Sequence, residues 1–463
     1  MSIHPAAPSA PIPACHRIVV VGAGFAGLSV VRGLAKREDV GITLVDKQNH
    51  HLFQPLLYQV ATAGLSPADI SAPIRTIVKR NNTTRVLLDE LLDIDREGRQ
   101  LKLSSGAEVG YDTLIIATGA RHSYFGNDQW AEHAPGIKTL DDAVSVRRRI
   151  LLAMESAETL RQEFPAERSI PINFVVIGGG PTGVEMAGAI AELTRHAVEM
   201  DFRFISPDCL RIILVEGNER LLMPFPPALS DYAKRALEHL GVEIRLKSRV
   251  TDITENEVFI DGDPMPSAAT IWAAGVQASP VARWLGVDGD RSGRVGVSAD
   301  LSLDGDSDIF VIGDTAAVTN DDGKPVPGIA PAAKQQGKYV AKLLNARLDG
   351  NPPPPPFHYR HQGSLATIGR KRAVVDFGWT RAKGLIAWLF WSTAHVYFLV
   401  GFRNRIVVGM NWLWNYLTFE RGARLITGLS AAPPRRPAKP APSLPEKTTG
   451  PPQHDDPLKV AAE

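Results

Sequence analysis

The stretch that decides the fold is RIVVVGAGFAGLSVVRGLAKREDVGITLVD, which runs from Arg17 to Asp46. It opens with a short β-branched run, 18–21, of the kind that forms a buried parallel strand. A glycine turn follows, and residues 28–34 then carry apolar side chains at helical spacing. A second apolar run, 42–45, ends in an acid. This order of strand, glycine turn, helix, strand and acid predicts a dinucleotide-binding unit.

The glycines and the acid of this unit each have a separate task. Gly22 allows the tight turn, Gly24 lets the backbone approach a pyrophosphate, and Gly27 lets helix and strand pack closely. The helix start adds free N–H groups and the positive end of the helix dipole. Asp46 can accept hydrogen bonds from the ribose hydroxyls of an adenosine. Because the flanking strands and the acid are all present, a plain glycine-rich loop is disfavoured.

The same pattern returns in the middle of the chain. A strand at 174–177 leads into GGGPTG at 178–183, then a helix at 184–193 and a strand at 211–215 that ends in Glu216. An acid at this position repels a 2′-phosphate and favours NADH over NADPH, although Arg220 close behind leaves some NADPH use open. Two such units predict the α/β class, with two Rossmann-like domains.

Composition narrows the function classes. The chain has 463 residues, enough for two or three domains, and a formal net charge of +1, so it has no global bias toward nucleic acid. Its two cysteines, Cys15 and Cys209, provide no disulfide framework. The His50-His51 pair lacks further ligands at metal-binding spacing, so no metal site is expected. Residues 141–164 are expected to form a charged amphipathic helix that is solvated, with an exposed run of arginines at 147–149.

The C-terminal part differs in composition from the rest. Five of the eight tryptophans fall between 379 and 414, and residues 360–430 carry ten Lys or Arg against two Asp or Glu. The apolar run 384–401 is shorter than the ~20 residues that a membrane-spanning helix needs. Tryptophan and tyrosine interleaved with arginine favour helices at the headgroup boundary of a membrane. A dimer interface or core cover, and a spanning helix, stay open as alternatives.

With these segments in place, the chain resembles the two-dinucleotide flavoprotein reductases, and within them the type II NADH:quinone oxidoreductases. The glycine turns and the Gly313-Asp314 pair are shared by the whole superfamily, whereas the C-terminal motifs point to this family. The matching stretches are GAGFAG at Gly22, FQPLLYQVATAGLSP at Phe53, LIIATGA at Leu114, VVIGGGPTGVEMAG at Val175, IWAAGVQASP at Ile271, FVIGDTA at Phe310, PAAKQQGKYVA at Pro331, LATIGRKRAVVDFG at Leu365, GFRNR at Gly401 and WLWNYLTFERGARLI at Trp412.

The resemblance implies non-covalent FAD in the first fold and NADH in the second. The residues that it assigns to FAD are Gly22, Gly24, Phe25, Ala26, Asp46, Lys47, Ala117, Thr118, Gly119 and Asp314. Those that it places against NADH are Gly180, Thr182, Gly183, Glu185, Glu216 and Gly275.

Three further residues are candidates for the chemistry. Glu185 follows the second glycine turn and would point toward the nicotinamide; as an alternative, it is only an acid favoured by the helix dipole. The family's quinone-site helix often reads AQxxxQ, and here Pro331 replaces the first glutamine while Gln335 matches the second. Lys371, or its neighbour Arg370, would provide the counter-charge to Glu185.

Composition at the two ends and the resemblance between them predict a domain order. A disordered leader is predicted at 1–15, the FAD-binding domain at 16–135 and 290–350, the NADH-binding domain at 136–289, a C-terminal amphipathic helical region for membrane anchoring and dimerisation at 351–430, and a disordered tail at 431–463. The first domain is discontinuous because the Gly313-Asp314 pair returns to it.

The implied activity is FAD-dependent oxidation of NADH with two-electron reduction of a membrane quinone, without proton pumping. The enzyme would be a peripheral homodimer on the cytoplasmic side of the inner membrane, without a nucleic-acid partner. Two other functions stay open: a soluble reductase for a ferredoxin or oxygenase, and a non-enzymatic flavin-bound interaction protein. The basic, Trp-rich C-terminal region argues against the soluble reductase.

Overall fold

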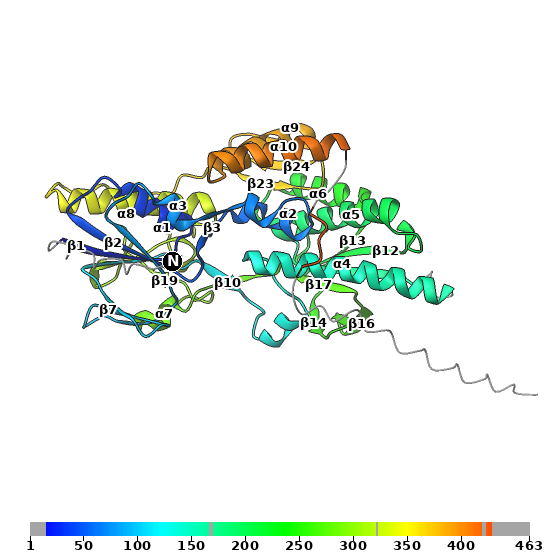
Figure 1. Cartoon of the computed structure of the whole chain (residues 1–463), viewed down its shortest axis with the longest axis horizontal. Coiled ribbons are helices and arrows are strands. Elements are labelled where there is room, and N and C mark those ends of the chain that lie inside the picture. Colours follow the sequence, from blue (N-terminus) through cyan, green and yellow to red (C-terminus); the bar gives the residue numbers. More distant parts are fainter. Residues whose placement is uncertain (1–14, 166–169, 321–322, 419–422, 428–463) are drawn as a thin grey trace, which may run out of the picture. The chain divides into compact units, whose positions relative to one another are not determined.

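The computed structural model describes residues 15–165, 170–320, 323–418 and 423–427. The predicted leader, apart from Cys15, and the predicted tail lie outside these residues. The described chain carries two separate sheets, one mainly and one fully parallel, with helices packed on them, and a C-terminal group of short strands and two helices (Figure 1). The predicted α/β class with two Rossmann-like units is confirmed.

The first sheet holds the opening glycine turn. Its strand order is β20-β21-β9-β1-β2-β5, and β1 lies between β2 and β9 with parallel register on both sides. Helix α1 follows the turn, and α8 packs against it (Figure 1). The bounds are β1 (His16–Val21), α1 (Phe25–Gly33), β2 (Val40–Asp46), β5 (Thr84–Leu88), β9 (Thr113–Ile116), β20 (Ser302–Leu303), β21 (Asp306–Val311) and α8 (Ala330–Leu348).

The second sheet repeats this arrangement with four parallel strands in the order β13-β12-β11-β17. Its helix α5 runs well past the predicted end at residue 193, because small apolar residues continue its buried face as far as Val198. The bounds are α4 (Leu140–Glu163), β11 (Ile172–Ile177), α5 (Pro181–Asp201), β12 (Leu210–Glu216), α6 (Pro227–His239), β13 (Val242–Leu246) and β17 (Ala269–Trp272).

Helix α4 is amphipathic as predicted, but the expected exposed run of arginines is wrong, because Arg147 is buried and Arg148 and Arg149 are half-buried. Ala143, Val146, Ile150 and Met154 recur at helical spacing and are buried against the second sheet, so the helix has a core-facing stripe. The arginine in the middle, Arg147, is only 5% exposed. The charge pattern of the arginine run gives no sign of the apolar stripe beside it, so charge alone suggested that these arginines are exposed.

Short sheets join and flank the two large ones. Strand β10 (Ala120–His122) pairs antiparallel with β18 (Val276–Ala278), where the chain crosses between the two parallel sheets. Two three-stranded meanders are formed by β6 (Leu91–Asp95), β7 (Gln100–Leu103) and β8 (Glu108–Gly110), and by β14 (Val250–Ile253), β15 (Glu257–Ile260) and β16 (Asp263–Pro266). Smaller elements are β3 (His50–Leu52), α2 (Leu57–Ala61), β4 (Ser71–Pro73), α3 (Ile74–Ile77), α7 (Val281–Leu285), β19 (Val295–Gly296) and β22 (Ala316–Ala317).

The C-terminal region forms a three-stranded sheet and a helical hairpin. The strands are β23 (Ser364–Thr367), β24 (Ala373–Asp376) and β25 (Arg381–Lys383), and the hairpin helices are α9 (Gly384–Phe398) and α10 (Phe402–Thr418). One side of the hairpin packs into the core of the second sheet through Ala387, Trp391, Val408 and Trp412. In the described part of the chain, no helix combines the length and apolarity that crossing a membrane requires.

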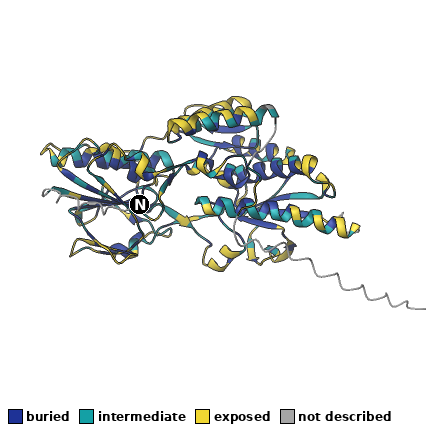
Figure 2. Cartoon of the chain, viewed as in Figure 1, coloured by how far each residue is buried: buried dark blue, intermediate teal, exposed yellow. Residues whose placement is uncertain are grey.

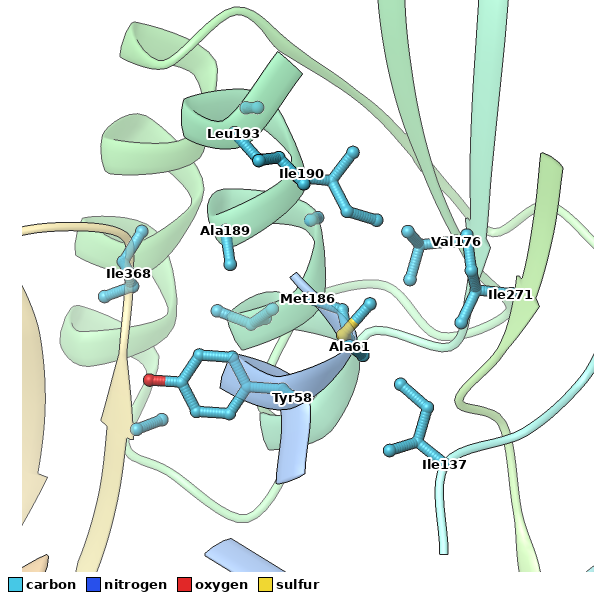
Figure 3. Close-up of a cluster of buried hydrophobic side chains, with 14 of the residues drawn as sticks. Tyr58, Ala61, Ile137, Val176, Met186, Ala189, Ile190, Leu193, Ile271 and Ile368 are labelled. Atoms are coloured by element: carbon cyan, nitrogen blue, oxygen red, sulfur yellow. The ribbon is translucent and has the colours of Figure 1, made fainter. Parts of the chain in front are cut away.

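Helix α2 joins this second core although it precedes the second sheet in the sequence. Figure 3 shows Tyr58 and Ala61 of α2 beside Met186 of α5, with Val176 and Ile271 of the second sheet facing Met186. The FQPLLYQVA stretch therefore fastens the first unit to the helix that follows the second glycine turn.

Candidate functional site

The first glycine turn has the geometry that a phosphate needs. Gly22 has φ +102°, and a Cβ there would stand 2.3 Å from the carbonyl oxygen of Ala117. A Cβ on Gly27 would stand 1.9 Å from the carbonyl oxygen of Gly22, so this position holds the helix against the turn. Gly24 is different, because a Cβ there would meet nothing within 4 Å. The open space lies at the N-terminus of α1, where backbone N–H groups favour an anion.

Asp46 lies beside this turn at the end of β2. Its Oδ2 accepts a hydrogen bond from the Ala23 N–H at 2.6 Å, and its Oδ1 accepts one from the Gln48 N–H at 2.7 Å. Burial raises the pKa of Asp46, and these two N–H groups oppose the rise. The carboxylate therefore lies at the turn, where the sequence predicts a ribose contact.

The second turn reproduces these contacts. Gly178 has φ +108°, a Cβ on Gly183 would stand 1.7 Å from the Gly178 carbonyl oxygen, and Gly180 is open. Glu216 accepts hydrogen bonds from the Gly179 N–H at 2.5 Å and from the Asn218 N–H at 2.8 Å. Two open helix starts, each with a carboxylate fastened to the turn, fit two dinucleotides.

The other predicted cofactor residues lie around these turns. Thr118 and Gly119 follow β9, and the Thr118 hydroxyl is 2.5 Å from the Ser279 hydroxyl. Gly275 follows β17 with φ +118°, and a Cβ there would stand 2.6 Å from the Phe125 ring. Asp314 lies in the turn between β21 and β22, where the Gly313 N–H donates to the Gln336 side chain at 2.6 Å. Lys47 is set apart, because its Nζ lies 3.4 Å from Glu90 at the exposed surface.

Glu185 faces a cavity of about 350 Å³ between α5 and the C-terminal hairpin. Aromatic side chains from α2, α9 and α10 form much of the wall: Tyr58, Trp388, Trp391, Trp412 and Tyr416. The rest of the polar lining comes from Gln59, Thr62, Glu192, Arg195, His196, Glu199, Thr367, Arg370 and Asn415.

Glu185 is half-buried as a residue, and protein groups surround its carboxyl. Its Oε1 accepts a hydrogen bond of 3.3 Å from the Thr367 N–H. Burial raises the pKa of Glu185 to about 8, and the Thr367 N–H and the Trp391 side chain only partly oppose this rise. Among the described residues, the Trp391 indole N–H has no hydrogen-bond partner of ordinary geometry. At neutral pH the carboxyl therefore holds a proton most of the time, which a surface glutamate does not.

The counter-charge predicted for Glu185 lies elsewhere. The Arg370 guanidinium donates to the Asn415 carbonyl and lies 5.1 Å from the centre of the Tyr416 ring, while the Arg370 N–H donates to Glu192 at 2.5 Å. Lys371 is exposed and does not line the cavity. Protonation, rather than an ion pair, therefore avoids the free-energy penalty of burying a charged carboxylate at Glu185. The catalytic assignment of Lys371 stays a prediction.

Gln335 lies on α8 in the predicted quinone-site motif, but its amide is engaged. Its Nε2 donates to the Arg360 carbonyl at 2.9 Å, and its Oε1 accepts from the Arg360 N–H at 3.0 Å. Pro331 stands in the first turn of α8, where proline is tolerated because the first N–H groups of a helix lack partners. The role of Gln335 toward a quinone stays a prediction.

Sequence reasoning missed two residues that surround Glu185, Thr367 and Trp391. Their separation from Glu185 along the chain leaves no spacing signal, and only the clustering of tryptophans pointed toward this region. In the described ranges, no group of three or more His, Cys, Asp or Glu side chains could hold a metal ion.

Comparison with known proteins decides between the flavoprotein classes. Residues 16–337 match the family model described as pyridine nucleotide-disulphide oxidoreductase, and residues 361–421 match the one described as NDH2 C-terminal domain. The chain is 42% identical over 438 residues to the type II NADH:quinone oxidoreductase Ndh of Mycobacterium tuberculosis, covering 92% of this chain and 93% of that protein.

The chain belongs to the type II NADH:quinone oxidoreductase family. A second M. tuberculosis relative, NdhA of the same description, is 43% identical over 428 residues, 89% of each chain. The fold also matches a solved NDH2 from Plasmodium falciparum in complex with NADH, with a TM-score of 0.78 over 89% of this chain and all of that chain, at 20% identity.

Membership settles the class of chemistry. The protein is an enzyme, an oxidoreductase that uses FAD and NADH and transfers electrons to a quinone, and these sequence predictions are confirmed. The resemblance stated from the C-terminal motifs is confirmed as well, because those motifs fall in the NDH2 C-terminal domain.

Proposed function

We propose that the protein works at a membrane surface and reduces a quinone dissolved in that membrane. The supporting observation is the outer face of the α9–α10 hairpin, which Figure 2 shows as exposed. Large apolar side chains cover this face: Leu385, Ile386, Leu389, Phe390, Tyr397, Phe398, Phe402, Ile406, Met410, Leu413 and Trp414. Residues 384–418 contain no acid and only two arginines. An apolar face of this extent is unfavourable in water and suits a lipid interface.

The two sides of the hairpin have separate roles. The inner side belongs to the core, where the Trp412 indole N–H donates to Gln59 at 2.8 Å. The outer residues 402, 406, 410 and 413 recur at helical spacing along α10 and are each at least half exposed. Deleting the hairpin would therefore uncover the core as well as remove the membrane contact, so point changes on the outer side are the cleaner test.

The test compares two sets of three substitutions. Phe402→Ser, Ile406→Ser and Met410→Ser remove apolar side chains from the outer face, and Leu88→Ser, Leu92→Ser and Met200→Ser remove equally exposed ones elsewhere. We expect the first set to weaken vesicle co-sedimentation by about tenfold or more, since each buried apolar side chain contributes about 1.5–3 kcal/mol at full burial. The control set should sediment like the parent. Equal sedimentation of both sets would overturn the proposal.

We assign three groups of residues to the reaction: those that would hold FAD, those that would hold NADH, and Glu185. Gly24, Asp46 and Asp314 would hold FAD, and Gly180 with Glu216 would hold NADH. When bound, FAD supplies the two-electron chemistry between NADH and a quinone. The overall reaction consumes one proton for each NADH and quinone converted to NAD⁺ and quinol. Glu185, which holds a proton at its carboxyl near neutral pH, would serve as a proton-holding group between the second turn and the cavity.

The finer assignments on location and assembly are also proposals. A cytoplasmic position, a peripheral mode of attachment and a homodimer follow from the family resemblance. The mode of attachment is supported further by the one-sided exposure of the hairpin. Release of intact enzyme from membranes by detergent, and its mass in detergent solution, would test attachment and dimerisation separately.

A further inference from the structure

Three basic side chains, Arg32, Lys338 and Arg405, lie close enough to Lys334 of α8 for their charges to act on it, and Lys334 lies beside the end of α9. Arg32 lies in the last turn of α1, Lys334 and Lys338 lie one turn apart on α8, and Arg405 lies in the first turn of α10. We call these four residues the basic cluster. Lys334 is at its centre, because its Nζ lies 5.1 Å from the centre of the Phe25 ring and 4.6 Å from that of Phe398.

The charges of the basic cluster are not balanced within the described residues. None of its four members forms an ion pair there, and no carboxylate contributes to the environment of Lys334. Burial, followed by the charges of Arg32, Lys338 and Arg405, lowers the pKa of Lys334 to about 8. The pKa of His51 is also lowered, to about 4, chiefly by burial and to a smaller extent by the charges of Arg32 and Lys334. Such a concentration of positive charge attracts an anion.

The basic cluster adjoins the outer apolar face. Phe398, which contacts Lys334, is 45% exposed, and Tyr397 is 67% exposed with the Arg405 guanidinium 5.9 Å from its ring centre. Phe402, at the start of α10, is 78% exposed. Exposed aromatic rings and cations in one place match the boundary between acyl chains and phosphate groups of a bilayer.

We propose that the basic cluster binds the phosphate group of an acidic phospholipid while the neighbouring rings enter the acyl region. This inference rests on the proposed membrane attachment and adds the class of lipid. A free phosphate ion would match the charges but would leave the exposed rings unused. A lipid satisfies both. Two members of the cluster lie on α8, which packs against α1, so the lipid would fasten the first unit to the membrane as well as the hairpin.

The test uses the full-length enzyme with vesicles of two compositions: phosphatidylcholine alone, and phosphatidylcholine mixed with phosphatidylglycerol in equal parts. The variant is Arg32→Gln with Lys338→Gln, because both residues are exposed and neither side chain donates a hydrogen bond within the part of the chain that the structure describes. The matched control is Arg283→Gln with Arg291→Gln, two exposed arginines outside the cluster. All three proteins should retain FAD and the same Tm.

We expect the parent to bind the acidic vesicles more tightly than the neutral ones. The double variant should lose about thirtyfold on acidic vesicles, equivalent to ~2 kcal/mol, because each basic residue near an anionic surface contributes ~1 kcal/mol. Its binding to neutral vesicles should not change, and the control should behave like the parent. A second variant, Lys334→Met, keeps the size of the side chain between the two rings and should lose about fivefold on acidic vesicles only.

Each other outcome has a defined meaning. Equal binding of the parent to both vesicles, or equal losses in the variant and the control, would overturn the lipid site and leave membrane attachment standing. Failure of the parent to bind either vesicle would contradict the attachment itself. Release from acidic vesicles by inorganic phosphate, but not by chloride of equal ionic strength, would show a free-anion site and overturn the lipid assignment.

Discussion

The two glycine-turn units share one geometry but use their helices differently. In both, the third motif glycine touches the first, the second is open, and an acid at the end of the next strand accepts an N–H from the turn. Helix α8 packs directly on helix α1. A Cβ added to Gly337 would stand only 2.3 Å from the Ala26 carbonyl oxygen. Helix α5 instead presents Glu185 and further polar residues to a cavity. The two turns therefore share one geometry, and the elements packed on each helix decide whether a cavity lies beside it.

A second difference concerns the acid. Glu216 is one methylene longer than Asp46, and its Oε2 reaches into the space that a Cβ on Gly179 would occupy, at 2.8 Å. The first unit combines the shorter acid with Ala23 at the same place. The turn residue and the acid therefore form a matched pair in each unit, because lengthening one requires shortening the other.

The largest expected effect comes from filling the open position of each turn. Gly24→Val should fold, since a Cβ there meets no protein atom, but should lose FAD because the side chain enters the pyrophosphate space. Gly180→Val should keep FAD and lose NADH oxidation. Absorbance of bound flavin and stopped-flow reduction by NADH measure the two outcomes.

Gly27→Val provides the contrast for this prediction, because its Cβ would overlap the Gly22 carbonyl oxygen and the fold itself should fail. Stoichiometric flavin in Gly24→Val would show that the open space is not where the pyrophosphate lies.

The next effect tests the chemistry on α5. Glu185→Gln should keep FAD and slow flavin reduction or quinone reduction by about tenfold or more, which is ~1.4 kcal/mol in the barrier. The matched position in α1 is Ser29, whose hydroxyl donates to the Phe25 carbonyl within its own helix at 2.6 Å. Ser29→Ala should change neither half-reaction. If stopped-flow traces of both variants equal those of the parent, Glu185 is only a helix-start acid.

The raised pKa of Glu185 also predicts how stability depends on pH. The folded carboxyl titrates at about 8 and the unfolded one near 4.5, so between these values the folded state binds more protons. Stability should therefore fall as pH rises through this window, by at most ~1.4 kcal/mol per pH unit. Glu185→Gln should lack this component, so its advantage over the parent grows with pH.

Denaturant unfolding of the flavin-loaded parent and variant at several pH values measures this difference. Parallel pH profiles would mean that the carboxyl has an ordinary pKa.

The smallest effect concerns the two acids. Glu216→Gln should narrow the preference for NADH over NADPH by about fivefold, or ~1 kcal/mol, because it removes a charge that repels the 2′-phosphate. Asp46→Asn should weaken FAD retention without changing that preference. The ratio of kcat/KM for the two nucleotides distinguishes them. Equal use of both nucleotides by the parent would remove the role assigned to Glu216.

Local sequence was sufficient for the turns because their requirements are local. Gly22 and Gly178 have positive φ, and Gly27 and Gly183 have no room for a side chain, so few other residues could stand there. The apolar runs on either side predicted the central strands, and the terminal acids were placed correctly beside the turns. The family motifs then identified the class of enzyme, since they extend into the C-terminal domain.

The surroundings of Glu185 depended on tertiary structure. The sequence alone predicted a cation near this acid, as burial of a charge usually requires one. The fold instead surrounds it with Thr367 and aromatic residues from distant segments, and the loss of water raises its pKa until the charge is mostly absent. Burial depends on which segments meet in space, and chain spacing does not encode it.

The same reason divides the rest of the molecule. The sequence by itself determined the two dinucleotide units and the apolar character of the C-terminal helices, because each follows from residues close together in the chain. The identity of the cofactors came from the family resemblance of the sequence. Only the tertiary structure decided which face of the hairpin is free and which residues form the basic cluster, because both depend on how α1, α8, α9 and α10 pack. The solvent exposure of a side chain is a property of the packed molecule rather than of its neighbours in sequence.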